Sequence, residues 1–312
     1  MKRLSWIAVL VLGLGMEPGA LAKPHIGLTE TAARGYSSTE ADGSFHLDEK
    51  AQWDADVTFT HTNSTTSGNL STANEFMFGA TDFLDDANDW RGAIDYWNDT
   101  TNKIRYVGPT ASYTHTWFET QGRVQDQDTV ETWGLTLDLG LNFYSADVDV
   151  TSNGKEVRKG TPNVVTKAAS VTTTQFHPSL TLEHAFYDEA LVPFITAGHY
   201  FYSVDPNTLE SAVNKVGVRL SPASTAGVDV LVGGFIKNSW ALGTVVVVAP
   251  KTKLKLEYGR NQSATDDTWS TAYSVKVEHT FGERWRGSLG WSHAVQQDVP
   301  IEFGTLGLAY LF

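Results

Sequence analysis

The sequence of 312 residues contains no cysteine, and this absence excludes several classes of protein. Without cysteine there is no disulfide framework, no thiolate zinc site and no cysteine nucleophile. Long hydrophobic runs are also missing after residue 22, whereas a membrane-spanning helix needs about 18 or more consecutive apolar residues. The chain is therefore not a helical membrane protein.

Basic residues are scarce relative to acidic ones. The chain has 23 Lys and Arg against 36 Asp and Glu, for a net charge of -13. Because nucleic-acid binding depends on neutralising phosphates with Lys and Arg, we expect no nucleic-acid partner. Charged residues make up only 19% of the chain and aromatic residues 12%, so the composition is too aromatic for a disordered protein.

The first 22 residues have the layout of a secretory signal peptide. Lys2 and Arg3 precede an apolar run over residues 7–14, and Ala20 and Ala22 supply the small residues of a cleavage site. We predict export from the cytoplasm with cleavage after Ala22.

The rest of the sequence alternates between apolar and polar residues, with the period of two that is typical of β-strands. The same alternation recurs in residues 53–60, 253–258 and 273–278. The runs are about a dozen residues long, which suits strands that cross hydrocarbon with one face on lipid and the other toward an interior. In the clearest window the apolar positions are Trp133, Leu135, Leu137, Leu139, Leu141 and Phe143.

The C-terminal strand carries the most specific pattern. Apolar residues occupy every second position and the chain stops on an aromatic residue, through Leu306, Leu308, Tyr310 and Phe312. This ending resembles the C-terminal assembly signal of the porin-like, Gram-negative outer-membrane β-barrels, although it identifies no subfamily. The resemblance implies location in the cell outer membrane among its lipids and lipopolysaccharide, a periplasmic C-terminus, and recognition of this strand by the barrel-assembly machinery.

A backbone in lipid must satisfy its hydrogen bonds internally, so these strands are expected to close. We predict an all-β fold, a transmembrane antiparallel up-and-down β-barrel of about 14 strands (range 12–16), over residues 51–312. Residues 23–50 are left with three alternatives, namely a periplasmic segment, a plug and an additional hairpin. Residues 63–69 and 147–171 are expected to be outer loops, the latter a hairpin that projects outward or folds into the lumen. The strands are placed near residues 51–62, 71–83, 90–97, 103–118, 130–146, 172–186, 191–202, 213–221, 226–236, 239–248, 252–261, 270–281, 285–294 and 301–312.

The polar phase of these strands assigns charged residues to the lumen, with acids mainly on the first six strands and bases mainly on the last eight. Opposite signs on opposing walls would create a transverse field that sets ion preference. The alternative is that the charges pair across strands, as Lys253 and Glu278 could. The predicted pore-lining residues are Asp54, Asp56, Asp138, Glu183, Arg219, Lys253, Lys255, Lys276 and Arg286, and the same phase includes Glu75, Arg91, Asp95, Lys215, Asp229, Glu257 and Glu278.

These features favour a porin-like channel for passive diffusion of small polar or charged solutes. Barrels of eight strands fill with side chains whereas sixteen to eighteen leave a passage, and fourteen lies between. One alternative is a transporter of hydrophobic compounds, because residues 226–236 and 239–248 are apolar on both faces, with Leu231, Val245 and Val247 in the inward phase. Another alternative is a structural or adhesive barrel without conductance. The sequence does not indicate an oligomeric state.

We do not expect an enzyme, a cofactor or a metal site. His177 shares a strand face with Ser179, and Ser292 adjoins His293, but neither pair lies in a catalytic motif. No metal-binding His-Glu motif, phosphate-binding glycine loop or calcium loop is present. The remaining histidines of note, His115, His184 and His279, fall in the apolar phase near strand ends, where they are expected in the interfacial girdle.

Overall fold

The structure of the chain is a computed structural model that describes residues 23–33, 35–48, 52–66, 69–100, 104–124, 127–151, 165–204, 236–264, 267–296 and 299–312. None of these residues forms a helix that is long and apolar enough to cross a membrane. The strands are β1 (His25–Ala33), β2 (Tyr36–His46), β3 (Trp53–Thr66), β4 (Asn69–Asp85), β5 (Asn88–Asp99), β6 (Ile104–Val124), β7 (Gln127–Thr151), β8 (Val165–Ala185), β9 (Leu191–His199), β10 (Phe201–Tyr202), β11 (Ile236–Ala249), β12 (Thr252–Ser263), β13 (Trp269–Phe281), β14 (Trp285–Gln296) and β15 (Val299–Leu311).

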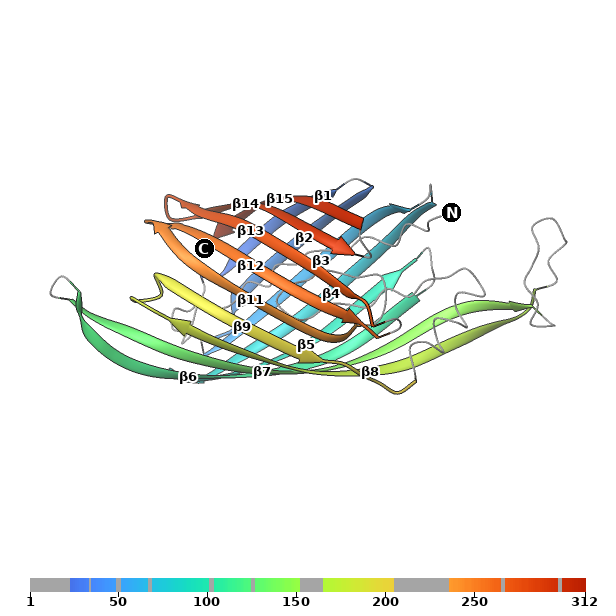
Figure 1. Cartoon of the computed structure of the whole chain (residues 1–312), viewed down its shortest axis with the longest axis horizontal. Coiled ribbons are helices and arrows are strands. Elements are labelled where there is room, and N and C mark those ends of the chain that lie inside the picture. Colours follow the sequence, from blue (N-terminus) through green and yellow to red (C-terminus); the bar gives the residue numbers. More distant parts are fainter. Residues whose placement is uncertain are drawn as a thin grey trace.

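The strands form one antiparallel sheet that closes on itself (Figure 1). Sequential strands pair from β1 to β9 and from β11 to β15, β9 pairs with β11, and β1 pairs with β15. The short β10 follows β9 after Tyr200 and also pairs with β8, so the two together count as one strand of a 14-stranded barrel. Closure removes free sheet edges and satisfies the backbone hydrogen bonds. The predicted fold class is confirmed.

The barrel is apolar outside and polar inside, the reverse of a water-soluble protein. On β7, Leu137 and Leu139 are exposed on the outer face, while Gly134 and Asn142 in the opposite phase are buried. Leu289 and Leu306 leave 64% of their surface exposed, which is tolerable only where the surrounding medium is itself apolar. The period-two pattern of the sequence thus separates a lipid-facing surface from an inner wall.

The two ends of the barrel differ. Short connections at residues 86–87, 187–190, 250–251 and 282–284 lie at one end, which we term the turn end. The opposite end, termed the loop end, has short connections after Ala33, Thr66 and Gln296 and also the longest intervals between strands, after Thr151 and after Tyr202. β1 begins and β15 finishes at the turn end. An antiparallel barrel alternates its connections between the two ends, and in membrane barrels the short turns lie on the periplasmic side.

Histidines and aromatic residues together form an outer girdle at the turn end. His115 and His279 hydrogen-bond to the cross-strand side chains of Asn88 and Thr252, at 2.7 and 2.8 Å. His184 stacks on Trp133 with ring centroids 4.1 Å apart. An imidazole with one polar partner and an aromatic neighbour suits the membrane interface, where one side of the ring is wet. The three histidines therefore occupy the girdle position expected from their phase.

Three strand assignments from the sequence require correction. The barrel wall does not begin near residue 51, because residues 25–46 form the β1–β2 hairpin of the wall. Of the alternatives for residues 23–50, the structure shows the additional hairpin. Residues 63–69 are not a loop, since β3 runs to Thr66 and β4 starts at Asn69. A loop over residues 147–171 is also wrong in its bounds, because β7 extends to Thr151 and β8 begins at Val165.

The strands predicted near 213–221 and 226–236 fall outside the described residues, apart from Ile236 at the start of β11. β9 pairs directly with β11 from Leu191 with Val246 to His199 with Asn238. No strand therefore separates β9 from β11 in the described wall. The predicted number of strands holds because the N-terminal hairpin takes the place of these two in the count.

The β8–β9 turn is held by an aspartate in a strained backbone. Tyr187, Asp188 and Glu189 all have positive φ, of 54°, 54° and 65°, which costs an L-residue about 1–2 kcal/mol each. The Asp188 carboxylate accepts a hydrogen bond of 2.9 Å from the Val130 N–H, and the Asp188 N–H donates to the Val130 carbonyl at 3.3 Å. These bonds attach the turn to β7 at the base of the long β6–β7 hairpin.

We expect Asp188→Ala to destabilise the barrel by about 1 kcal/mol, because it removes the acceptor for Val130. Asp188→Asn should stay close to the wild type, since asparagine keeps an acceptor oxygen and tolerates positive φ. Urea unfolding in lipid vesicles measures both. Equal losses in the two variants would contradict this role for the carboxylate oxygen.

Candidate channel lining

Eight of the nine predicted pore-lining residues lie on the inner face of the barrel. Their phase is opposite to that of the exposed apolar side chains on the same strands. They are Asp54 and Asp56 on β3, Asp138 on β7, Glu183 on β8, Lys253 and Lys255 on β12, Lys276 on β13 and Arg286 on β14. The ninth, Arg219, lies outside the described residues, as do Lys215 and Asp229.

The inner face of β12–β14 carries a basic cluster near the turn end, defined as Lys253, Lys255, Lys276 and Arg286. Lys276 pairs with Glu278 at 2.6 Å and Lys255 with Glu257 at 3.2 Å. Each pair lies on one strand two residues apart, which places both side chains on the same face. Lys253 stands opposite Glu278 in the register, so Glu278 is shared by several bases. The cluster keeps more positive than negative groups.

The inner face of β3–β8 is predominantly acidic. Arg91 donates from Nη2 to Asp56 Oδ2 at 2.7 Å and from Nε to Oδ1 at 3.3 Å, reaching across β4. The bridge passes over Gly79, where an added Cβ would lie within 2.6 Å of Asp56. His46 contacts Asp54 at 2.5 Å. Glycine at position 79 therefore gives the ion pair room to lie against the wall.

Other acids on this wall are held by hydroxyl groups. Tyr106 is buried and donates its hydroxyl to Glu75 at 3.1 Å and to Asp95. Asp138 accepts hydrogen bonds from Ser112 and, at 3.1 Å, from Ser179. A hydroxyl partner fixes the geometry of a carboxylate without neutralising its charge. These contacts fix the positions of the carboxylates on the inner wall.

The order of strands around the barrel places the two groups on opposite walls. In a closed ring of 14 strands, the diametrically opposed strand is about seven positions away. β12, β13 and β14 therefore face β4, β5 and β6, which contribute Glu75 and Asp95. The strand order thus sets these acids and the basic cluster on opposite walls, with Glu75 and Asp95 farther from the turn end than the cluster.

Two inner acids are absent from the predicted pore lining, because the predicted barrel wall starts at residue 51 and leaves out β2. Glu40 and Asp42 lie on the inner face of β2, next to Thr29 and Gly27 of β1. Asp42 accepts from His25 Nε2 at 2.7 Å, and His25 Nδ1 also contacts Ser44 at 2.8 Å. The alternation Glu40, Asp42, Ser44 was the signal available in the sequence.

A short apolar strip interrupts the polar wall between the acidic and basic sectors. Val192 and Phe194 of β9 share the inner phase with Val245 of β11, which pairs with Val192. The Lys255 ammonium lies 5.5 Å from the centre of the Phe194 ring, at the border between the strip and the basic cluster. Among the other inward apolar residues of the sequence analysis, Leu231 lies outside the described residues, and Val247 adjoins a β-bulge.

The described residues contain no group of three or more His, Asp or Glu placed to hold a metal ion. His177 and Ser179 do share the inner face of β8, as predicted from the sequence. Ser179 donates to Asp138, and the His177 ring stacks on Tyr200 at 5.3 Å. These contacts are those of wall side chains packed against their neighbours.

No protein-family model matches the chain, and no curated protein matches its sequence. Among solved structures, the chain is similar to the CymD monoaromatic hydrocarbon channel, with a TM-score of 0.50 and 9% identity over 98% of this chain and 95% of that one. The chain has the fold of the outer-membrane β-barrels. A Pseudomonas aeruginosa FadL homologue gives a TM-score of 0.48 with 10% identity, over 95% of this chain and 93% of that one. The KdgM porin gives 0.40 with 7% identity, over 92% of this chain and 99% of that one.

The four residues of the predicted C-terminal signal face outward from the barrel. Leu306 and Leu308 are exposed by 64% and 53%, and Phe312 by 60%. Tyr310 packs edge-on against Trp285 with ring centroids 5.0 Å apart. The alternation in the last strand therefore corresponds to a lipid-facing surface of β15.

Proposed function

We propose that the chain is an outer-membrane channel for the passive diffusion of small polar or charged solutes. The observation that carries the proposal is the inner wall, with its basic cluster on β12–β14 opposite acids on β4 and β5. Fixed charges that line a pore set its ion preference and orient solutes by their dipoles. The fold is one that outer-membrane channels use.

The proposal includes a place in the cell. An exported chain with its signal peptide removed after Ala22 would meet the barrel-assembly machinery through β15 and insert among the lipids and lipopolysaccharide of the outer membrane. The apolar outer surface supports such an insertion, because it is stable only in contact with lipid. Cell fractionation tests the location in the outer membrane, and sequencing of the N-terminus of the mature protein tests cleavage after Ala22.

A second candidate function rests on the apolar strip of Val192, Phe194 and Val245. A continuous apolar path along the inner wall would suit hydrophobic compounds, and the similar CymD structure is described as a monoaromatic hydrocarbon channel. We place this function second because the strip occupies only β9 and β11, whereas charged side chains occupy both walls beside it.

Conductance in planar bilayers distinguishes the candidates. We expect refolded protein to give discrete current steps in potassium chloride, whose size scales with salt concentration. Electrical silence together with uptake of an aromatic hydrocarbon into protein-containing vesicles would favour the second candidate. Electrical silence without uptake of the hydrocarbon would overturn both candidate functions and leave a structural role for the barrel.

A further inference from the structure

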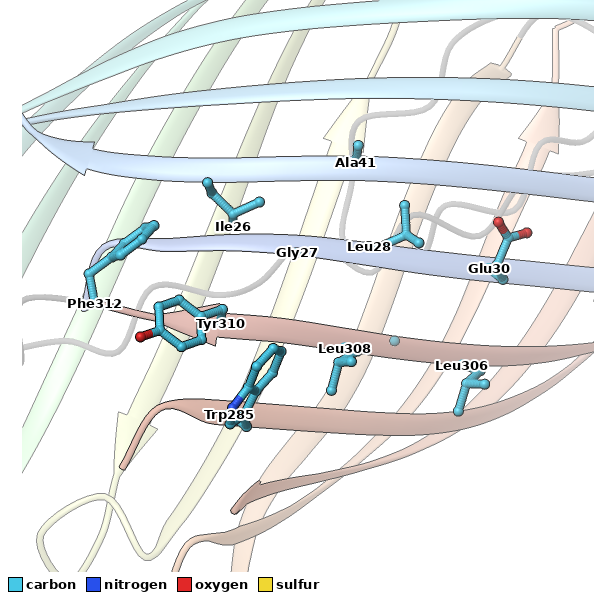
Figure 2. Close-up of a pocket in the computed structure, with 11 residues that line it drawn as sticks. Ile26, Gly27, Leu28, Glu30, Ala41, Trp285, Leu306, Leu308, Tyr310 and Phe312 are labelled. Carbon is cyan, nitrogen blue, oxygen red and sulfur yellow. The ribbon is translucent and has the colours of Figure 1, made fainter. Parts of the chain in front are cut away.

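An apolar groove of about 620 Å³ runs along the outer face of the barrel where its first and last strands meet. Figure 2 shows Ile26 and Leu28 of β1 beside Leu306 and Leu308 of β15, with Trp285, Tyr310 and Phe312 gathered at one end. The groove is shallow-walled on the side of β2, because the side chain of Ala41 there is a single methyl group. A hollow in the lipid-facing surface accommodates a single lipid chain, whereas a flat surface makes even contact with the surrounding lipid.

The length of the groove corresponds to one leaflet of a membrane. From Phe312 to Leu306 the strand advances six residues, or about 20 Å at 3.3 Å per residue. With a strand tilt of about 40°, this run rises about 15 Å, which is half of a hydrocarbon core of about 30 Å. At its loop-side limit lies Glu30, whose carboxylate accepts a hydrogen bond of 2.7 Å from Thr39. The aromatic end of the groove lies at the turn end, where β15 finishes.

The turn end of the groove carries positive charge. Arg284 donates from Nη1 to the Tyr310 hydroxyl at 3.1 Å, which holds its guanidinium beside the aromatic residues. Lys251 donates to the Gly282 carbonyl at 2.5 Å in the same pair of turns. Lys23 is exposed and precedes Pro24, whose carbonyl accepts from the Phe312 N–H at 3.0 Å.

The charge at this place is distinctive among the described turns. The turns at residues 85–87 and 187–190 carry Asp85, Asp86, Asp188 and Glu189 and no Lys or Arg. The turn end from β11 to β15 and β1 instead carries Lys23, Lys251 and Arg284, with Glu283 as the acid in the turn of Arg284. A cation beside an apolar groove and aromatic rings matches the phosphate, the acyl chain and the interfacial region of a phospholipid.

We propose that this groove binds one anionic phospholipid of the periplasmic leaflet, with an acyl chain between β1 and β15 and the headgroup phosphate at Arg284. The inference depends on the orientation of the barrel in the membrane and not on its conductance. The bound lipid fills the hollow at the seam where the first and last strands pair. It would thereby stabilise the closure of the barrel.

Native mass spectrometry of the full barrel tests the proposal with two probes, phosphatidylglycerol and phosphatidylcholine with identical acyl chains. We expect one retained phosphatidylglycerol, bound at least about fivefold more tightly than phosphatidylcholine. The double variant Lys23→Gln, Arg284→Gln should bring the ratio close to one. Lys237→Gln is the matched control, because Lys237 is a loop-end cation paired with Asp267 at 2.8 Å.

The groove itself is tested by filling it. Ala41→Trp should abolish retention of the lipid, and Ala41→Leu should weaken it if the larger side chain prevents folding. Ala197→Trp is the control, since Ala197 is an exposed outer-face alanine of β9, away from the groove. Equal binding of both lipids, or full retention by Ala41→Trp, would overturn the proposal. A dimer that is lost on Ala41→Trp would overturn it too and assign the groove to a second copy of the chain.

Discussion

Replacing the basic cluster with glutamine shifts the reversal potential of the channel strongly toward cation selectivity. The variant combines Lys253→Gln, Lys255→Gln, Lys276→Gln and Arg286→Gln. It leaves Glu257 and Glu278 without their lysine partners at 3.2 and 2.6 Å, so the β12–β14 wall changes from net positive to net negative. The acids of the opposite wall are unchanged, so both described walls then carry a net negative charge. Fixed charge of one sign then favours the entry of cations.

The shift should be several tens of millivolts in a tenfold potassium chloride gradient. Ideal selectivity for a monovalent ion corresponds to about 59 mV per tenfold ratio, which sets the ceiling. Screening shortens the range of each charge to about 10 Å at 0.1 M salt, so the shift should shrink as salt rises. Lys237→Gln removes one exposed positive charge at the loop end and should leave the potential nearly unchanged.

The converse experiment removes acids from the wall opposite the basic cluster. Glu75→Gln combined with Asp95→Asn keeps the Tyr106 hydrogen-bond network but removes the charge of both acids. We expect this variant to move the reversal potential toward anion selectivity. If neither variant changes the potential, the charges cancel within each wall and the transverse field does not govern the lumen.

Much of the wall could be predicted from the sequence, and the failures have a physical cause. β7 was found because every outward position from Trp133 to Phe143 is large and apolar. β1 and β2 were missed because their outer face carries small and polar residues, including Glu30, Thr39 and Gly43. The groove follows from the same pattern, since the small Ala41 of β2 stands beside the bulkier Ile26 and Leu28 of β1.

The candidate channel lining could likewise be predicted in part from the sequence. The inward phase of the acids and bases follows from period two alone, and the eight described residues lie on the inner face of the barrel. The sequence suggested Lys253 with Glu278 across strands, and the register does set these two residues opposite each other. It did not predict that Lys276 also pairs with Glu278 along β13, or Lys255 with Glu257 along β12. Long side chains on one face select the nearest charge, and only the three-dimensional structure determines which is nearest.

We expect Gly140→Val to destabilise the barrel by about 3 kcal/mol, at the upper end of the cost of overpacking. Gly140 lies on the inner face of β7, opposite His177 of β8 in the register. The imidazole of His177 lies across this glycine, so that an added Cβ would overlap the ring. The ring cannot easily withdraw, because it stacks on Tyr200 at 5.3 Å with an angle of 25° between the planes.

Gly92→Val is the matched control for this substitution. Gly92 lies within β5 on the outer face, and a Cβ added there has no atom within 4 Å. Valine suits an exposed, lipid-facing strand position, so the stability should change by less than about 0.5 kcal/mol. Urea unfolding in vesicles, followed by tryptophan fluorescence, measures both variants. A similar loss of stability in both variants would mean that the barrel does not tolerate a side chain at either strand glycine. A loss confined to Gly140→Val would show that inner glycines let large polar side chains lie flat against the wall, which keeps those side chains out of the centre of the lumen.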